Sequence, residues 1–214
     1  DLVRSRGLGD VYKRQMLHLS TVESTTLELL KKLQQLPVLC NTRLVGGTAL
    51  ALQLGHRKSV DLDFFGQINV DSQDLKEALR TLGTLTILND SKNIHIYVLN
   101  EVKIDIVNYT YPWLDDVVYK DGIRLASPRD IAAMKITAIE GRGTKKDFVD
   151  IYFLLKKYSL KNLLDFYSQK YPDSSSFMAM KSLAYFEDAE EEPMPYMFVD
   201  VSWDEIKKSI LSRL

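Results

Sequence analysis

Two aspartates separated by a single leucine, Asp61 and Asp63, occupy a short run of bulky residues that ends at Gly66. Such a run predicts a β-strand, and alternate residues of a strand point to the same face, so the two carboxylates should lie side by side. Two like charges held close together are unfavourable unless a cation lies between them. The pair is therefore a candidate Mg²⁺ site, although an isolated Asp-x-Asp also suits a solvated strand end.

A third aspartate, Asp105, lies in one of two alternating apolar runs, NIHIYVLN at 93–100 and EVKIDIVN at 101–108. Because little more than Asn100-Glu101 separates the apolar segments, they predict an antiparallel hairpin. Asp105 shares its strand face with Lys103, so an ordinary surface role is the alternative. If this strand neighbours residues 60–65, the three carboxylates converge, an arrangement that suits two metal ions in an in-line displacement.

A glycine pair, Gly46-Gly47, precedes a short apolar helix predicted from Thr48 to Leu54. Glycines let backbone N–H groups approach a phosphate closely, and the positive end of the helix at Thr48 would add to the attraction. A tight strand-to-helix turn would need the same glycines. The turn is not a Walker A loop, because no Gly-Lys-Ser/Thr follows it, and it lacks the third glycine of a dinucleotide-binding fingerprint.

Three further polar residues could contact phosphates. Arg57 and Ser59 lie immediately before the acidic strand, although a surface arginine and a turn serine fit equally well. Lys135 is the lone charge of an otherwise apolar helical segment, IAAMKITAI, where the alternative is a lysine that extends its ammonium to solvent.

A second charged cluster follows this helix. Asp147 and Asp150 are three residues apart and should share one side of their helix. Arg142, Lys145 and Lys146 crowd the preceding turn. This turn could bind nucleotide phosphates or an RNA acceptor, or it could be a solvated charged face.

The elements that must position these residues fall into two parts, which predicts an α+β fold. Residues 16–125 show helical patterns mixed with strands and should form a mixed α/β sheet domain. Residues 126–214 show only helical patterns, beginning where Pro128 follows Ser127, and should form an all-helical domain. Residues 1–15 have no usable periodicity and end just before Met16. We expect them to be a non-native or disordered leader.

The composition is that of an ordinary globular protein. The chain has 214 residues, 45% hydrophobic, with a net charge of −1, so its overall charge does not indicate nucleic-acid or membrane binding. Its single cysteine, Cys40, excludes an internal disulfide framework and agrees with a cytoplasmic location. No apolar run approaches the ~20 residues that span a bilayer.

The order of these motifs resembles the nucleotidyltransferase superfamily related to DNA polymerase β. Three segments are closer still to the AbiEii/AbiGii-type nucleotidyltransferase toxin family: GGTALAL, HRKSVDLDFF and SPRDIAAMKITAIEGRGTKKDFVDIYFLL. The resemblance covers about residues 40–160. It implies an enzyme that uses Mg²⁺, or alternatively Mn²⁺, to transfer a nucleoside monophosphate from an NTP to an acceptor with release of pyrophosphate.

The same resemblance implies a role for each candidate residue. It assigns Gly46, Gly47 and nearby Ser59 to the phosphate-binding turn, Asp61, Asp63 and Asp105 to the metal, Lys135 to the triphosphate, and Asp147 or Asp150 to the later catalytic motifs. Family members resemble toxins of toxin–antitoxin and abortive-infection pairs, and some transfer nucleotides to tRNA. tRNA is therefore the favoured acceptor, and a cognate antitoxin is an expected partner.

Two other interpretations fit parts of the sequence. The chain could be a catalytically silent nucleotidyltransferase fold that acts by binding a partner, but the presence of all three carboxylates argues against an inactive site. A phosphatase-type nucleophile at Asp61 would need an apolar strand running into it, whereas Arg57, Lys58 and Ser59 precede it.

Overall fold

A seven-stranded mixed β-sheet is the central element of the protein. The computed structural model describes residues 16–214, and the prediction made for residues 1–15 lies outside them. The strands are β1 (Thr42–Val45), β2 (Leu62–Gly66), β3 (Leu85–Asp90), β4 (Ile94–Leu99), β5 (Val102–Asn108), β6 (Val118–Lys120) and β7 (Ile123–Leu125). Their order across the sheet is β3-β4-β5-β2-β1-β7-β6.

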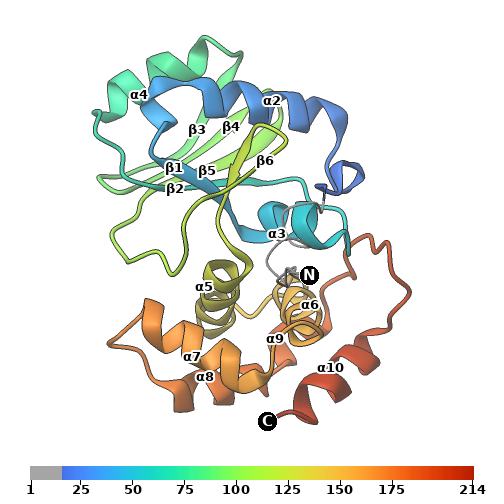
Figure 1. The fold of residues 1–214 in the computed structure, drawn as a ribbon. Coiled ribbons are helices and arrows are strands. Elements are labelled where there is room, and N and C mark those ends of the chain that lie inside the picture. Colours follow the sequence, from blue (N-terminus) through green and yellow to red (C-terminus); the bar gives the residue numbers. More distant parts are fainter. Residues whose placement is uncertain (1–15) are drawn as a thin grey trace, which may run out of the picture.

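Helices cover both faces of this sheet (Figure 1). They are α2 (Ser24–Gln35), α3 (Gly46–Leu54), α4 (Ser72–Arg80), α5 (Pro128–Gly141), α6 (Lys145–Leu155), α7 (Leu160–Lys170), α8 (Ser176–Leu183), α9 (Glu187–Glu190) and α10 (Trp203–Leu211), with 3₁₀ turns η1 (Leu19–Thr21) and η2 (Pro37–Leu39). Every element after β7 is a helix, so the α+β fold class is confirmed. Within residues 16–214, no helix has the length and apolar character needed to cross a membrane.

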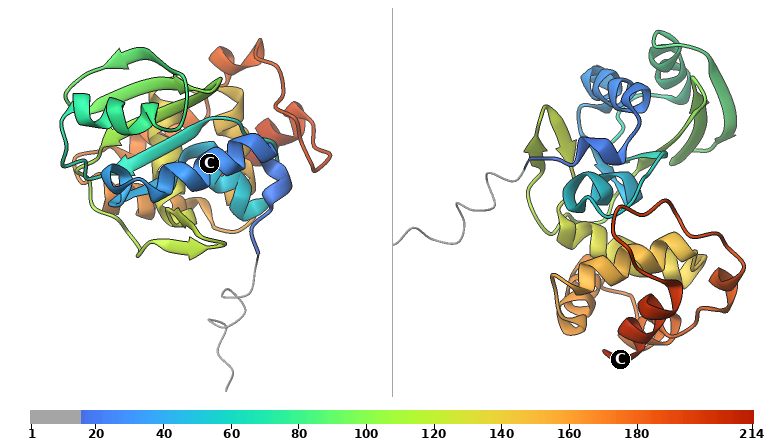
Figure 2. Two further views of the ribbon diagram at one scale, coloured as in Figure 1. Left: turned by 90° about the horizontal axis from the view of Figure 1, so that it is seen from above. Right: turned by 90° about the vertical axis from the view of Figure 1, so that its right-hand side faces the viewer.

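The two faces of the sheet have different roles. On β2, Leu62 and Phe64 are fully buried and face the side covered by α2 and α4. Asp63 and Phe65 alternate with them, so they point to the opposite face, toward the helical part. Figure 2 shows the helices α5 to α10 gathered on that side. The alternation of β2 therefore places Leu62 and Phe64 in the apolar core and Asp63 on the opposite face of the sheet.

The predicted hairpin is present and brings the acidic strands together. β4 and β5 pair in antiparallel fashion, and the turn residues Asn100 and Glu101 have φ values of 48° and 69°, as a two-residue type I′ turn requires. β5 then pairs with β2 in parallel, with Asp105 directly opposite Asp63. The condition under which the carboxylates of these two strands converge is therefore met.

Several elements differ from the sequence interpretation. Four strands, β1, β3, β6 and β7, were not predicted; three of them have only three or four residues, and β3 is largely exposed and lacks apolar alternation. Helix α3 begins at Gly46, so both glycines belong to its first turn.

Candidate active site

Asp63 and Asp105 form a carboxylate pair across β2 and β5. Burial and the negative charge of Asp105 raise the pKa of Asp63 to about 6, and Asp61 contributes in the same direction. Both oxygens of Asp105 lie within 2.9 Å of Lys103 Nζ. The pair is thus a concentration of negative charge that a cation would stabilise.

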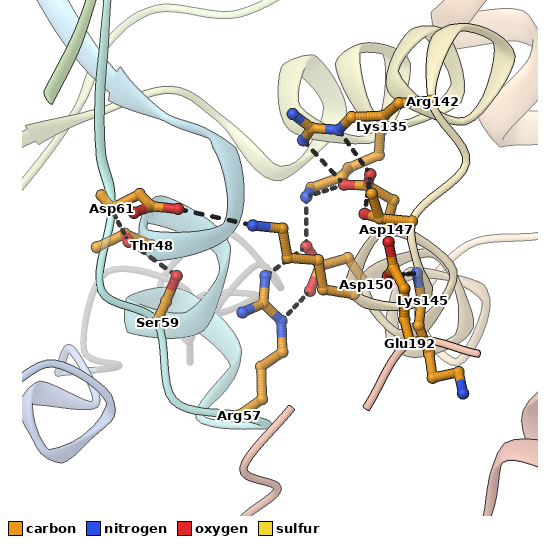
Figure 3. A network of polar contacts seen from close by, with 12 residues as sticks. Thr48, Arg57, Ser59, Asp61, Lys135, Arg142, Lys145, Asp147, Asp150 and Glu192 are labelled. Carbon is orange, nitrogen blue, oxygen red and sulfur yellow. Dashed lines mark hydrogen bonds and ion pairs between the residues drawn. The ribbon is translucent and has the colours of Figure 1, made fainter. Parts of the chain in front are cut away.

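Asp61 lies near this pair but faces a different partner. It precedes β2 by one residue, and its Oδ2 is 3.6 Å from Lys146 Nζ on α6 (Figure 3). Across residues 16–214, no three His, Cys, Asp or Glu side chains are grouped closely enough to hold a metal ion. The sequence predicted a three-carboxylate site, whereas the structure presents two converging carboxylates with the third directed toward a lysine.

The glycine turn borders the carboxylate pair as expected, and each glycine permits a separate close approach. A Cβ on Gly46, which has a φ of 67°, would lie 2.1 Å from Asp63 Oδ2. A Cβ on Gly47 would lie 2.3 Å from Arg57 Nη2. No other residue type could place the backbone so near both groups without moving them.

Thr48 and Ser59, both predicted to contact nucleotide, are buried and contact each other. Thr48 Oγ1 lies 2.9 Å from Ser59 Oγ and also donates to the backbone carbonyl of Asp61 (Figure 3). These contacts tie the first turn of α3 to the segment leading into β2. In this arrangement both hydroxyls position the glycine turn.

Arg57 packs against Gly47 of the glycine turn and is held there by Asp150. Its Nε and Nη2 donate to the two carboxylate oxygens of Asp150 at 2.7 and 2.8 Å, and its side chain is only 3% exposed. His56 Nε2 lies 2.8 Å from the same carboxylate. The arginine joins the segment before β2 to helix α6, and its contact with phosphate stays a prediction.

Lys135 is likewise held by carboxylates. Its Nζ lies 2.8 Å from Asp147 Oδ1 and 2.6 Å from Asp150 Oδ2, and its side chain is 5% exposed. Burial alone would raise the pKa of Asp150, but Arg57 and Lys135 hold that pKa well below its ordinary value. Asp147 and Asp150 share one side of α6 as predicted, and they are the acceptors of a buried ionic network (Figure 3).

The three cations of the basic turn, Arg142, Lys145 and Lys146, differ in how far they are exposed to solvent. Lys145 is buried: its backbone N–H donates to Glu192 Oε2 at 2.7 Å and its Nζ to the Glu190 carbonyl at 2.9 Å. Arg142 donates to Asp147 at 3.0 Å but keeps 59% of its side chain exposed, and Lys146 is 44% exposed. Arg142 and Lys146 are therefore the cations that an anionic ligand could reach.

A cavity of about 460 Å³ lies between the carboxylate pair and helix α5. Gly46, Asp63 and Asp105 line it from the sheet, and Lys135 and Arg142 line it from the helical part. Four aromatic residues form another part of its lining, which we call the aromatic wall: Phe65, Tyr109, Tyr111 and Tyr171. The sequence interpretation missed this wall, and the only local signal for it is the aromatic run YTYPW at 109–113.

The family comparison agrees with this geometry. The profile of the family described as "Nucleotidyl transferase AbiEii toxin, Type IV TA system" matches residues 28–213. An uncharacterized protein of Aquifex aeolicus (strain VF5) is 37% identical over 187 residues, which is 85% of this chain and 90% of that protein.

Solved structures with a similar fold include nucleotidyltransferases. ANT(2")-Ia in complex with adenylyl-2"-tobramycin matches with a TM-score of 0.54 and 12% identity, over 68% of this chain and 96% of that one. MenT4, a nucleotidyltransferase toxin of Mycobacterium tuberculosis, matches with a TM-score of 0.47 and 14% identity, over 90% and 86% of the two chains. The first of these likenesses shows a shared nucleotidyltransferase fold.

Proposed function

The chain belongs to the AbiEii nucleotidyl transferase toxin family and is a nucleotidyltransferase, and we propose that it transfers a nucleoside monophosphate from an NTP to RNA, with tRNA as the favoured acceptor. The observation that carries the proposal is the carboxylate pair of Asp63 and Asp105, which lies directly beside the Gly46 turn at one side of the cavity. Carboxylates beside a backbone turn at a helix N-terminus are what a metal-bound triphosphate requires.

The carboxylates present fit Mg²⁺. Mg²⁺ is usually bound by one or two carboxylates together with substrate phosphates, so Asp63 and Asp105 suffice without a complete protein cage. Burial and the charge of Asp105 together raise the pKa of Asp63, and a divalent cation would relieve the repulsion between the two carboxylates. Asp61 would join them if Lys146 released it. When bound, Mg²⁺ or Mn²⁺ would neutralise triphosphate charge and acidify the attacking hydroxyl.

The proposed reaction is an in-line displacement at the α-phosphorus. The acceptor hydroxyl gives its proton to Asp105, and its oxygen forms a bond to the α-phosphorus. The bond between that phosphorus and the oxygen bridging to the β-phosphate breaks, and pyrophosphate leaves with the bonding electrons. Positioning and charge stabilisation supply most of the catalysis in phosphoryl chemistry of this kind.

The cations around the cavity would have different roles in the reaction. Arg142 and Lys146 are exposed enough to contact the β- and γ-phosphates directly. Lys135, the predicted triphosphate ligand, would act at a distance while Asp147 and Asp150 hold it. Arg57 would act as a positioning residue, because it packs beneath Gly47 and fixes the turn.

The biological setting is proposed from the family. A cytoplasmic toxin that modifies RNA would be paired with a cognate antitoxin, and its NTP and tRNA substrates would both be available there. The transfer reaction is the part of this proposal that can be tested directly.

The test uses purified protein, Mg²⁺, each α-labelled NTP in turn, and total cellular RNA as acceptor. We expect label from one NTP to enter an RNA band with wild-type protein and to be absent with Asp63→Asn. The matched control is Asp173→Asn, at an exposed carboxylate outside the cavity, which should label RNA like wild type.

Other outcomes would contradict the proposal in different ways. Label in a protein band or on a small molecule would show that the acceptor is that molecule and not RNA. No label with any NTP, together with equal growth inhibition by wild type and Asp63→Asn in cells, would leave a catalytically silent module that acts by binding a partner.

A further inference from the structure

A second cavity, of about 600 Å³, adjoins the first on the same face of the sheet. Tyr109 and Tyr111 line both cavities, so these two rings form the wall between them. We call the second cavity the acceptor groove; its other lining side chains include Cys40, Arg43, Trp113 and Arg124. None of the reaction steps above uses this groove.

The strand register places the groove next to the reacting centre. Val45 of β1 lies opposite Asp63 of β2, and two residues along the same strands Arg43 lies opposite Phe65. Alternate residues share a face and are separated by roughly 7 Å. The groove therefore begins one side-chain row away from the catalytic carboxylates.

The charge of the groove differs from that of the active-site cavity. Arg43 and Arg124 line it, and none of the described residues that line it is acidic. Backbone carbonyls hold both guanidinium groups: Arg43 donates to Asp115 O at 2.8 Å, and Arg124 donates to Leu39 O at 3.1 Å. Within residues 16–214, neither guanidinium is hydrogen-bonded to a carboxylate, although the charges of Asp130, Asp116 and Asp115 act on Arg43 from outside the lining. Because the described lining itself carries two arginines and no acidic side chain, the groove favours an anionic ligand.

The exposed aromatic ring of Tyr111 accompanies these cations, whereas Tyr109 is buried. Tyr111 is 50% exposed, and the Arg43 guanidinium lies 4.3 Å from the centre of the Trp113 ring. Grooves that bind unpaired polynucleotides combine cations for the backbone with rings on which bases stack. A protein segment or a sugar could pack on the aromatic residues but would not need the two arginines that line the groove.

The segment that carries Tyr109, Tyr111 and Trp113 is hydrogen-bonded to the helical part of the protein. Lys170 is fully buried, and its Nζ donates to the Pro112 carbonyl at 2.8 Å and to Asp130 Oδ1 at 2.7 Å. Asp130 in turn accepts from the Leu114 N–H at 2.9 Å. The segment that carries Tyr111 is thus held in place before any ligand binds, which lowers the entropic cost of binding.

We propose that the acceptor groove binds an unpaired RNA strand and delivers its terminal hydroxyl past Tyr109 and Tyr111 to the carboxylate pair. This inference rests on the proposed function and adds the location and the chemical class of the acceptor. It predicts that RNA and NTP occupy adjoining but separate cavities.

The single cysteine of the chain provides a direct test, because Cys40 is exposed and lines the groove. The rate at which N-ethylmaleimide alkylates Cys40 is measured by mass spectrometry in wild-type protein. We expect a short single-stranded RNA to slow alkylation several-fold, whereas NTP with Mg²⁺ alone should not. Repeating the measurement with Asp63→Asn removes catalysis and should leave the protection intact.

A variant series tests the stacking residue. Tyr111→Ala should weaken RNA binding about tenfold, the effect of losing one base–ring stack, whereas Tyr111→Phe should bind like wild type. Tyr185→Ala is the control, because this tyrosine is similarly exposed, at 53%, but lies outside the groove. Arg43→Gln should make the affinity less dependent on salt.

The outcomes separate this inference from the proposed function. Label transfer to RNA without protection of Cys40 would contradict RNA binding in the acceptor groove but support the proposed nucleotidyl transfer. Protection by RNA without transfer from any NTP would support the groove and overturn the reaction. Equal RNA binding by Tyr111→Ala and wild type, with both proteins folded by circular dichroism, would also overturn the groove.

Discussion

At the scale of single residues, Asp63 combines a functional position with a cost in stability. Its ionised form is disfavoured by burial and by Asp105, so its pKa is about 6 in the folded protein against the ordinary value of 3.8. The folded state therefore binds the proton more tightly than the unfolded state. The favourable contribution of protonated Asp63 is complete below pH 3.8 and is lost as the pH rises through about 6.

Replacing this carboxylate should stabilise the metal-free protein at neutral pH. In EDTA at pH 7.5, Asp63→Asn should raise the free energy of unfolding, with an upper limit of roughly 3 kcal/mol from the pKa difference. The gain should shrink as the pH falls toward 4. Urea unfolding at several pH values measures it, and a variant no more stable than wild type at pH 7.5 would contradict the inferred repulsion.

The same pair predicts how metal acts on stability. Mg²⁺ should raise the melting temperature of wild-type protein at pH 7.5 but have little effect on Asp63→Asn, because a ligand that binds only the folded state stabilises it. The rise should diminish below about pH 6, where Asp63 is protonated. Equal shifts in the two proteins would place the metal elsewhere.

Asp150 is the opposite case, a buried carboxylate whose loss should be costly. It is fully buried and accepts from both Arg57 and Lys135, so Asp150→Asn would leave excess positive charge in the interior. We expect a loss of about 3–5 kcal/mol in urea unfolding. Asp165→Asn, which breaks an exposed pair with Lys161, should change stability little. Similar effects at the two sites would show that the buried network is not tightly coupled.

At the scale of elements, the close approach of Gly46 to Asp63 can be tested separately from the left-handed backbone conformation of this glycine. Gly46 and Gly122 both have left-handed φ values, 67° and 78°, but a Cβ on Gly46 would meet Asp63 whereas nothing lies within 4 Å of one on Gly122. Alanine at either position should cost roughly 1–2 kcal/mol of backbone strain. Only Gly46→Ala should also displace Asp63.

We expect Gly46→Ala to lower the single-turnover rate of nucleotidyl transfer about 100-fold, since a misplacement of about 1 Å has effects of that size. Gly122→Ala should react like wild type at a temperature where both variants are folded. Comparable rates for the two variants would mean that the close approach of Gly46 to Asp63 is not needed for transfer.

At the scale of the whole molecule, the sheet and the helical part share one apolar core. The core cluster runs from Leu30 of α2 through Phe64 of β2 to Ile206 of α10. The buried pair of Arg57 and Asp150 adds an ionic connection between the two parts. The two sequence-defined domains should therefore unfold together.

Two tryptophans report on the two parts, since Trp113 lies beside the sheet and Trp203 begins α10. In Trp113→Phe and in Trp203→Phe, the fluorescence midpoint in urea should match that variant's own circular dichroism midpoint. Each variant is compared with itself, because removing Trp113 also removes its contacts with Arg43 and Lys170. Separate midpoints would establish two independently folding domains.

The sequence by itself determined the features that depend on local pattern. The period of two in residues 93–108 predicted the β4–β5 hairpin, and the run of bulky residues around Asp61 and Asp63 predicted the strand β2, although not its pairing with β5. Ser127 and Pro128 marked the start of α5, where Ser127 Oγ caps the helix. These predictions succeeded because strand alternation, turn type and helix capping are set by residues a few positions apart. The short or exposed strands β1, β3, β6 and β7 lack such a pattern.

Only the tertiary structure decided which charged side chains are available to a ligand. In the sequence, Arg57, Lys135 and Lys145 are as plausible for phosphate binding as Arg142 and Lys146. Folding pairs the first three with Asp150, Asp147 and the segment around Glu190 and leaves the last two exposed. Burial and ion pairing depend on groups far apart in the chain, and so does the aromatic wall shared by the two cavities.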